Sequence, residues 1–218
     1  MKRAVYIGGF ANGDKTAQGV AKELEEYYSP VESFSFSWAM ANPDKIHKAT
    51  NNAHIITHSA GMLAVVQAKA QPKQLTSFSP PLPLGLLQYP AKTIAKRTRM
   101  HTHNIGITGT EDVAAIKAYE KSSAAELLRR PLGNFRHLGA ISRFDAVSAA
   151  VDFVREGVPT TLSYTEGDEY FQLPKEREDL ARIVGVKIVR MAGIHDELPI
   201  RPKATLELFY TDTLGMDL

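Results

Sequence analysis

Side chains of the types that form a nucleophile, its base and an orienting acid each follow a run of residues typical of a buried strand. Ser59 follows the apolar run 53–57, while Asp168 and His195 follow two later runs of the same kind. Serine becomes a strong nucleophile when an imidazole takes its proton, and a carboxylate can hold that imidazole in the required tautomer. The three residues are therefore candidates for one catalytic group.

The turn around Ser59 is built from small residues. A predicted strand becomes a predicted helix within two residues, and Thr57 and Gly61 leave room for backbone on both sides of the serine. At a helix N-terminus the amide of Ala60 can face a developing oxyanion, although Ser59 could also be only a helix N-cap. The segment Thr57-His58-Ser59-Ala60-Gly61 resembles the Gly-x-Ser-x-Gly elbow of the α/β-hydrolase family, with threonine replacing the first glycine.

The later segments resemble the same family, in which the serine, the acid and the histidine follow in this order along the chain. Gly167-Asp168 is similar to the family's acid segment, and Gly193-Ile194-His195 is similar to its Gly-x-His segment. The resemblance implies that Asp168 orients His195 and that His195 is the base. Glu166 and Glu169 remain alternatives for the acid because they stand so close to Asp168.

The end of the first predicted strand completes the resemblance. It reads Gly8-Gly9-Phe10 and is similar to the loop that supplies the second oxyanion amide in the family, so the resemblance implies an oxyanion hole made by the amides of Phe10 and Ala60. We also expect substrate-binding positions at Gly9, His58, Pro80 and Leu82, although Leu82 could instead anchor the insertion to the core.

Strands and helices alternate outside the middle of the chain, and this alternation predicts a parallel sheet covered by helices on both faces. We expect an α/β fold: a three-layer sandwich around a mostly parallel sheet of about six strands, within a single domain over 1–218. Residues 81–157 are predicted to be a mainly helical cap or lid insertion, with helical stretches over 109–130 and 144–156. The predicted strands cover 3–7, 31–38, 53–57, 75–78, 158–164 and 186–189, and the predicted helices outside the insertion cover 16–28, 43–50, 60–70, 175–184 and 204–210.

Composition excludes several other classes. The 218 residues include no cysteine, so disulfides and thiolate chemistry are absent, and a net charge of +2 does not favour a nucleic-acid partner. No apolar run approaches the length of a membrane span. We expect a cytoplasmic monomer or homodimer without metal or cofactor. His101, His103 and His137 could in principle bind a metal, but polar residues of the insertion are the simpler interpretation.

These expectations converge on a serine hydrolase that cleaves a small-molecule carboxylic ester or thioester through an acyl-enzyme on Ser59. Two alternatives stay open. One is a protein that keeps the fold only to bind a ligand, without turnover. The other is a hydrolase of a different bond, such as an amide or a lactone, because one fold can carry several chemistries.

Overall fold

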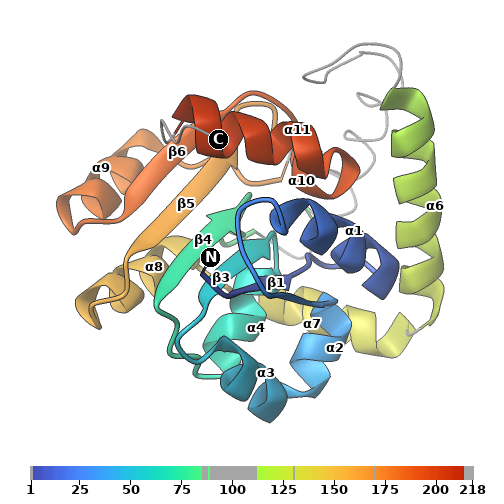
Figure 1. Ribbon diagram of the computed structural model, residues 1–218, viewed down its shortest axis with the longest axis horizontal. Helices are drawn as coiled ribbons and strands as arrows, with labels where there is room; N and C mark the ends of the chain where they lie inside the picture. The colour runs from blue at the N-terminus through green and yellow to red at the C-terminus, as the bar shows by residue number, and fades with distance from the viewer. Residues whose placement is uncertain (1, 85–87, 89–111, 130, 169, 214–218) are drawn as a thin grey trace.

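Six parallel strands form one sheet, in the spatial order β2-β1-β3-β4-β5-β6. The structure is a computed structural model that describes residues 2–84, 88, 112–129, 131–168 and 170–213 (Figure 1). The reversal of strand order beside β1 is typical of open α/β sheets, in which ligands bind at the carboxyl ends of the strands. The strands are β1 (Ala4–Ile7), β2 (Val31–Phe34), β3 (His54–His58), β4 (Gln74–Phe78), β5 (Thr160–Thr165) and β6 (Lys187–Met191).

Helices cover both faces of the sheet, so the predicted three-layer α/β architecture is confirmed. One face packs against α1 (Asp14–Leu24) and the C-terminal helices, in a cluster that contains Tyr6, Ile56 and Phe209. The other face packs against the remaining core helices, in a cluster that contains Ile55 and Leu75. Those helices are α2 (Phe36–Ala41), α3 (Pro43–Thr50), α4 (Gly61–Gln67), α8 (Ala146–Arg155) and α9 (Lys175–Ile183).

The predicted strand 31–38 is wrong in its second half. Strand β2 ends at Phe34, which pairs with Ile7 at the end of β1, and α2 begins at Phe36. An edge strand has no partner beyond the end of its neighbour, so the chain turns into a helix there. Phe36 and Ala39 are buried three positions apart on one face of this helix. The alternation of aromatic and small polar residues had suggested a strand there.

The range predicted to be an insertion contains α6 (Asp112–Arg129) and α7 (Pro131–Ile141), and α6 stands along one side of the molecule, against α10 (Glu197–Ile200) (Figure 1). Helix α8 also lies within the range 81–157, yet it contacts α4, β5 and α9 as part of the helical layer. Its buried residues Ala146, Val147, Ala150 and Phe153 form the apolar stripe of an ordinary crossover helix. The expectation of a cap therefore concerns the residues before α8.

The chain closes with α11 (Pro202–Glu207) and a π-helical segment η1 (Leu208–Thr213), so helical structure begins before the predicted 204–210 and extends past it. Leu206, Phe209 and Tyr210 from this end pack on the same sheet face as α1. No helix in the described ranges is both long enough and apolar enough to cross a membrane.

Candidate active site

Ser59 occupies a strained turn directly after β3. Its φ of 48° is unusual for a residue with a side chain, and its amide donates to the carbonyl of Phe78 at 2.8 Å. A strained serine between a strand and a helix projects its hydroxyl above the carboxyl edge of the sheet. Thr57, which replaces the expected glycine, fits because it is fully buried and donates its hydroxyl to Ser77 Oγ on β4 at 2.7 Å.

The structure brings Ser59, His195 and Asp168 together in one hydrogen-bonded line. His195 Nε2 lies 2.9 Å from Ser59 Oγ, and His195 Nδ1 lies 2.8 Å from Asp168 Oδ2. All three side chains are buried, and none is more than 8% exposed. With Nδ1 protonated and held by the carboxylate, Nε2 is left as an acceptor facing the serine hydroxyl. This arrangement can deprotonate a serine as it attacks.

Asp168 is fixed from its other side by backbone. Its Oδ1 accepts hydrogen bonds from the amides of Tyr170 and Phe171, each at 2.8 Å. The rings of these two residues pack on the imidazole of His195, with centroid distances of 5.0 and 5.3 Å. Glu166 is exposed, and Glu169 lies outside the described residues. Of the candidate acids that the structure describes, only Asp168 is hydrogen-bonded to the base.

The loops that carry the acid and the base are joined to each other. The amide of Gly167 donates to the carbonyl of Gly193 at 2.8 Å, and a Cβ at residue 167 would stand only 2.5 Å from that oxygen. The base loop is also braced by Glu197, which accepts from the Ile194 amide at 3.1 Å and from Arg201 at 2.8 Å. Sequence reasoning missed Glu197; its spacing of four from Arg201 was the available signal.

The predicted oxyanion amides belong to Phe10, on the loop after β1, and to Ala60, which stands between Ser59 and the start of α4. Neither amide donates to another residue in the described part of the chain. Gly9 packs tightly beside them, since a Cβ there would stand 2.7 Å from His58 Nδ1 and 3.0 Å from Ser59 Cβ. Two amides without acceptors beside a nucleophile can receive a developing negative charge.

The other predicted substrate-binding residues take supporting positions. His58 is 1% exposed, with Nε2 2.9 Å from the carbonyl oxygen of His195 and Nδ1 3.3 Å from the side-chain nitrogen of Asn12. Pro80 and Leu82 are buried, and Leu82 belongs to the core cluster under α8. Each of these three residues is buried, and their contact with substrate stays a prediction.

Sequence reasoning also missed two residues that bond around His58. Asn12 lies on the loop after β1, 2% exposed, and its Oδ1 accepts from the hydroxyl of Tyr119 on α6 at 2.8 Å. Only a structure links these two, because 107 residues separate them in sequence.

A small cavity of about 10 Å³ lies beside His195, lined by both apolar and polar side chains. Its volume matches a single water molecule. The hydroxyl of Thr165 is buried beside it without a hydrogen-bond partner in the structure. Its remaining lining includes Ser79, Ser163 and Thr205.

Within the described ranges, one group of three side chains could offer metal ligands: His58, His195 and Asp196, with ligand atoms within 4.8 Å of one another. The hydrogen bonds of the two imidazoles already use these nitrogens, so the group is accounted for without an ion. His101 and His103 lie outside the described residues. His137 is described on α7, where burial, and then the positive charge of Arg136, lower the pKa of its imidazole.

Comparison with known proteins identifies the fold. No family model matches the chain, and no curated protein matches it in sequence. Among solved structures, a hydrolase from Oleispira antarctica matches at 14% identity and a TM-score of 0.62, over 94% of this chain and 89% of that one. An esterase from Thermogutta terrifontis matches at 14% identity and a TM-score of 0.60, over 94% of this chain and 86% of that one.

A further match is the thioesterase domain from the curacin biosynthetic pathway, at 16% identity and a TM-score of 0.53, over 94% of this chain and 89% of that one. Structural similarity at such low sequence identity is evidence for a shared fold only. The chain has the α/β-hydrolase fold that the sequence motifs resemble.

Proposed function

We propose that this chain is a serine hydrolase in which Ser59 is the nucleophile, His195 the base and Asp168 the acid that orients it. The observation that carries the proposal is the line of 2.9 and 2.8 Å contacts through His195, which begins at a serine with a φ of 48°. Three loops that are far apart in sequence meet in the order and geometry that acyl transfer requires.

The reaction follows from these positions. As Ser59 Oγ attacks a carbonyl carbon, His195 Nε2 takes the hydroxyl proton and Asp168 stabilises the resulting imidazolium. The amides of Phe10 and Ala60 receive the oxyanion. His195 then gives its proton to the departing alcohol or thiol, leaving an acyl group on Ser59. A water, deprotonated by the same nitrogen, attacks the acyl carbon and releases the acid and the serine.

A small-molecule carboxylic ester or thioester is the proposed substrate class. This choice rests on analogy with the fold, since one proton from His195 serves an alcohol, a thiol or an amine leaving group alike. An esterase and a thioesterase domain stand among the chains of similar fold, which agrees with this class.

Labelling with a fluorophosphonate probe tests the proposal, because the probe phosphonylates a serine only where a base activates it. The wild-type protein should be labelled, Ser59→Ala should not be, and His195→Ala should be labelled far more slowly. Ser148→Ala is the matched control, since Ser148 is an exposed residue near the start of α8 and should leave labelling unchanged. Full labelling of Ser59→Ala would overturn the proposal.

A panel of p-nitrophenyl esters of graded acyl length, with matching thioesters, then separates the substrate classes. Hydrolysis of either series that depends on Ser59 supports the proposed bond. Labelling by the probe without turnover of either series points to an amide or lactone substrate.

A further inference from the structure

A chain of buried hydrogen bonds runs from the insertion helix α6 to the backbone of the base. The hydroxyl of Tyr119 donates to Asn12 Oδ1 at 2.8 Å, Asn12 Nδ2 lies 3.3 Å from His58 Nδ1, and His58 Nε2 lies 2.9 Å from the carbonyl oxygen of His195. Asn12 and His58 are at most 2% exposed, so the two contacts of the His58 ring are shielded from water, while the contact of Tyr119 with Asn12 is partly buried.

The donors and acceptors along this chain fit one arrangement. A carbonyl oxygen can only accept, so His58 Nε2 carries the proton, and Asp196 Oδ1 at 3.8 Å favours the same tautomer. Nδ1 of the neutral ring is then an acceptor for the amide group of Asn12. Burial raises the pKa of the Tyr119 hydroxyl, which keeps it protonated and able to donate to Asn12 Oδ1.

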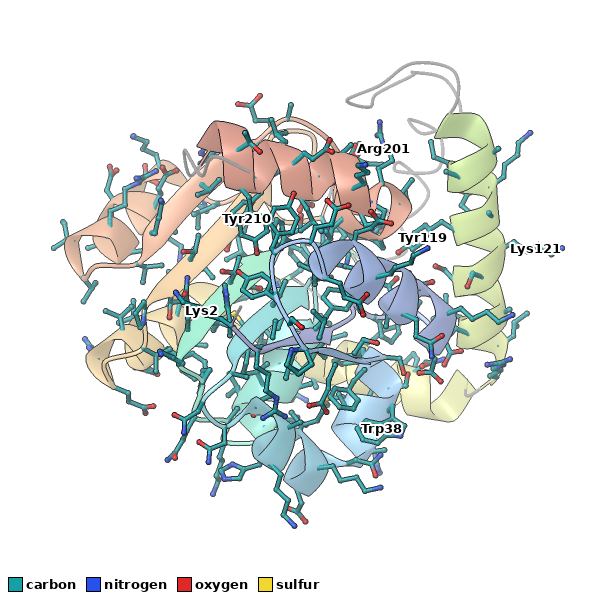
Figure 2. All side chains as sticks on the ribbon, in the orientation of Figure 1. Lys2, Trp38, Tyr119, Lys121, Arg201 and Tyr210 are labelled. Atoms are coloured by element: carbon teal, nitrogen blue, oxygen red, sulfur yellow. The ribbon has the colours of Figure 1, made fainter. Side chains whose placement is uncertain are left out.

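The same helix also contacts the base loop directly, through apolar side chains. Ile116 of α6 packs with Ile194, the residue before His195, and with Ile200 of α10. Figure 2 shows Tyr119 pointing from α6 into the body of the molecule and Lys121 pointing away from it. The inner face of α6 thus meets the base loop directly through Ile116, and it meets the loop after β1 through the hydrogen bond from Tyr119 to Asn12.

We infer that Tyr119, Asn12 and His58 are positioning residues that couple the seating of α6 to the placement of the catalytic base, so that the insertion regulates how well His195 activates Ser59. His195 is held by its side chain through Asp168 and, independently, by its main chain through His58. Without the hydrogen bond from His58, the main chain of His195 can shift. The imidazole then moves relative to Ser59 Oγ, 2.9 Å away, and small displacements at this contact slow the reaction strongly. This inference rests on the proposed function.

The test measures the second-order rate of fluorophosphonate labelling at Ser59, and kcat and KM for a p-nitrophenyl ester. Tyr119→Phe removes one hydroxyl and keeps the ring, and we expect labelling and kcat to fall about three- to tenfold while KM changes little. His58→Gln, which retains a donor toward His195, should keep more activity than His58→Leu. In the His58→Leu background, Tyr119→Phe should have a smaller effect because the chain is already broken.

Tyr28→Phe is the matched control. The hydroxyl of Tyr28 makes a buried 3.0 Å hydrogen bond to Tyr210, and its ring packs on His54 at the opposite end of β3 from Ser59. Its loss should lower the melting temperature without slowing labelling.

The outcomes separate the two proposals. A wild-type protein that is neither labelled nor active defeats the proposed function. If labelling depends on Ser59 but proceeds at the wild-type rate in Tyr119→Phe and in whichever His58 variants fold, the function stands and the coupling is wrong. Equal slowing by Tyr28→Phe and Tyr119→Phe would also defeat the coupling, since it would reflect general loss of stability.

Discussion

Gly61 lies so close to the end of β1 that a Cβ placed on it would stand 2.4 Å from the carbonyl oxygen of Ile7 and 3.0 Å from that of Gly8. No side chain fits there unless backbone moves. The glycine two residues after Ser59 therefore lets the first turn of α4 pack against the loop that carries the Phe10 amide. The elbow and the oxyanion loop are held in contact at this point.

Gly61→Ala is accordingly expected to disturb the site and to destabilise the fold by about 1–3 kcal/mol, the usual cost of overpacking. Gly19→Ala is the control, because a Cβ at this α1 position meets no atom within 4 Å. Removing the flexibility of a helical glycine should stabilise the protein by about 0.5–1 kcal/mol. Urea denaturation of both variants gives the comparison, and a Gly61→Ala protein as stable as wild type would contradict the packing described.

Asp168→Asn should lower kcat by about 10³- to 10⁴-fold with little change in fold. The Tyr170 and Phe171 amides donate to Oδ1, so the new amide nitrogen would face His195 Nδ1 and force the proton onto Nε2, toward Ser59. That tautomer cannot accept the serine proton. Glu166→Gln, at an exposed position in the same loop, should keep about wild-type kcat. Loss of activity in Glu166→Gln instead would move the acid to Glu166.

The candidate catalytic residues were predictable because each follows a strand whose apolar run is visible in the sequence. The end of β2 was not, because the alternation of Phe34, Phe36 and Trp38 continues after the neighbouring strand has ended. Phe36 can be buried by the period of a strand or by the period of a helix. The end of the pairing between β2 and β1 decided between the two. His58 remains a predicted substrate contact. Its ring partners come from remote loops, which no local pattern reveals.

Arg201 and Glu197 form a buried ion pair at 2.7 Å, with Arg201 8% and Glu197 1% exposed. Arg201→Met should destabilise the protein by about 3–5 kcal/mol, because it leaves the carboxylate buried without its arginine. The double variant Glu197→Gln with Arg201→Met should lose less free energy of unfolding than the sum of the losses in the two single variants. Lys203→Met breaks the exposed pair with Glu207, of the same i, i+4 spacing, and should cost less than about 1 kcal/mol. Chemical denaturation of the wild type, Arg201→Met, Glu197→Gln, their double variant and Lys203→Met measures these differences, and simple additivity would argue against a buried pair.

His54 makes the stability of the fold depend on pH. Burial, and to a smaller extent the charge of Lys2, lower the pKa of its imidazole from 6.5 to about 4, and its Nε2 lies 2.9 Å from Thr76 Oγ1. Between those two values the unfolded chain binds a proton that the folded chain does not, so stability falls as the pH falls from about 6.5 towards 4. The shift corresponds to about 3 kcal/mol.

His54→Gln cannot take up this proton, so we expect its free energy of unfolding to decline less than that of the wild type between pH 7 and pH 4.5. The comparison uses the difference between the two slopes, because other groups titrate equally in both proteins. Urea denaturation at half-unit pH intervals provides it. Parallel curves would mean that His54 takes up its proton equally in both states and would contradict the lowered pKa.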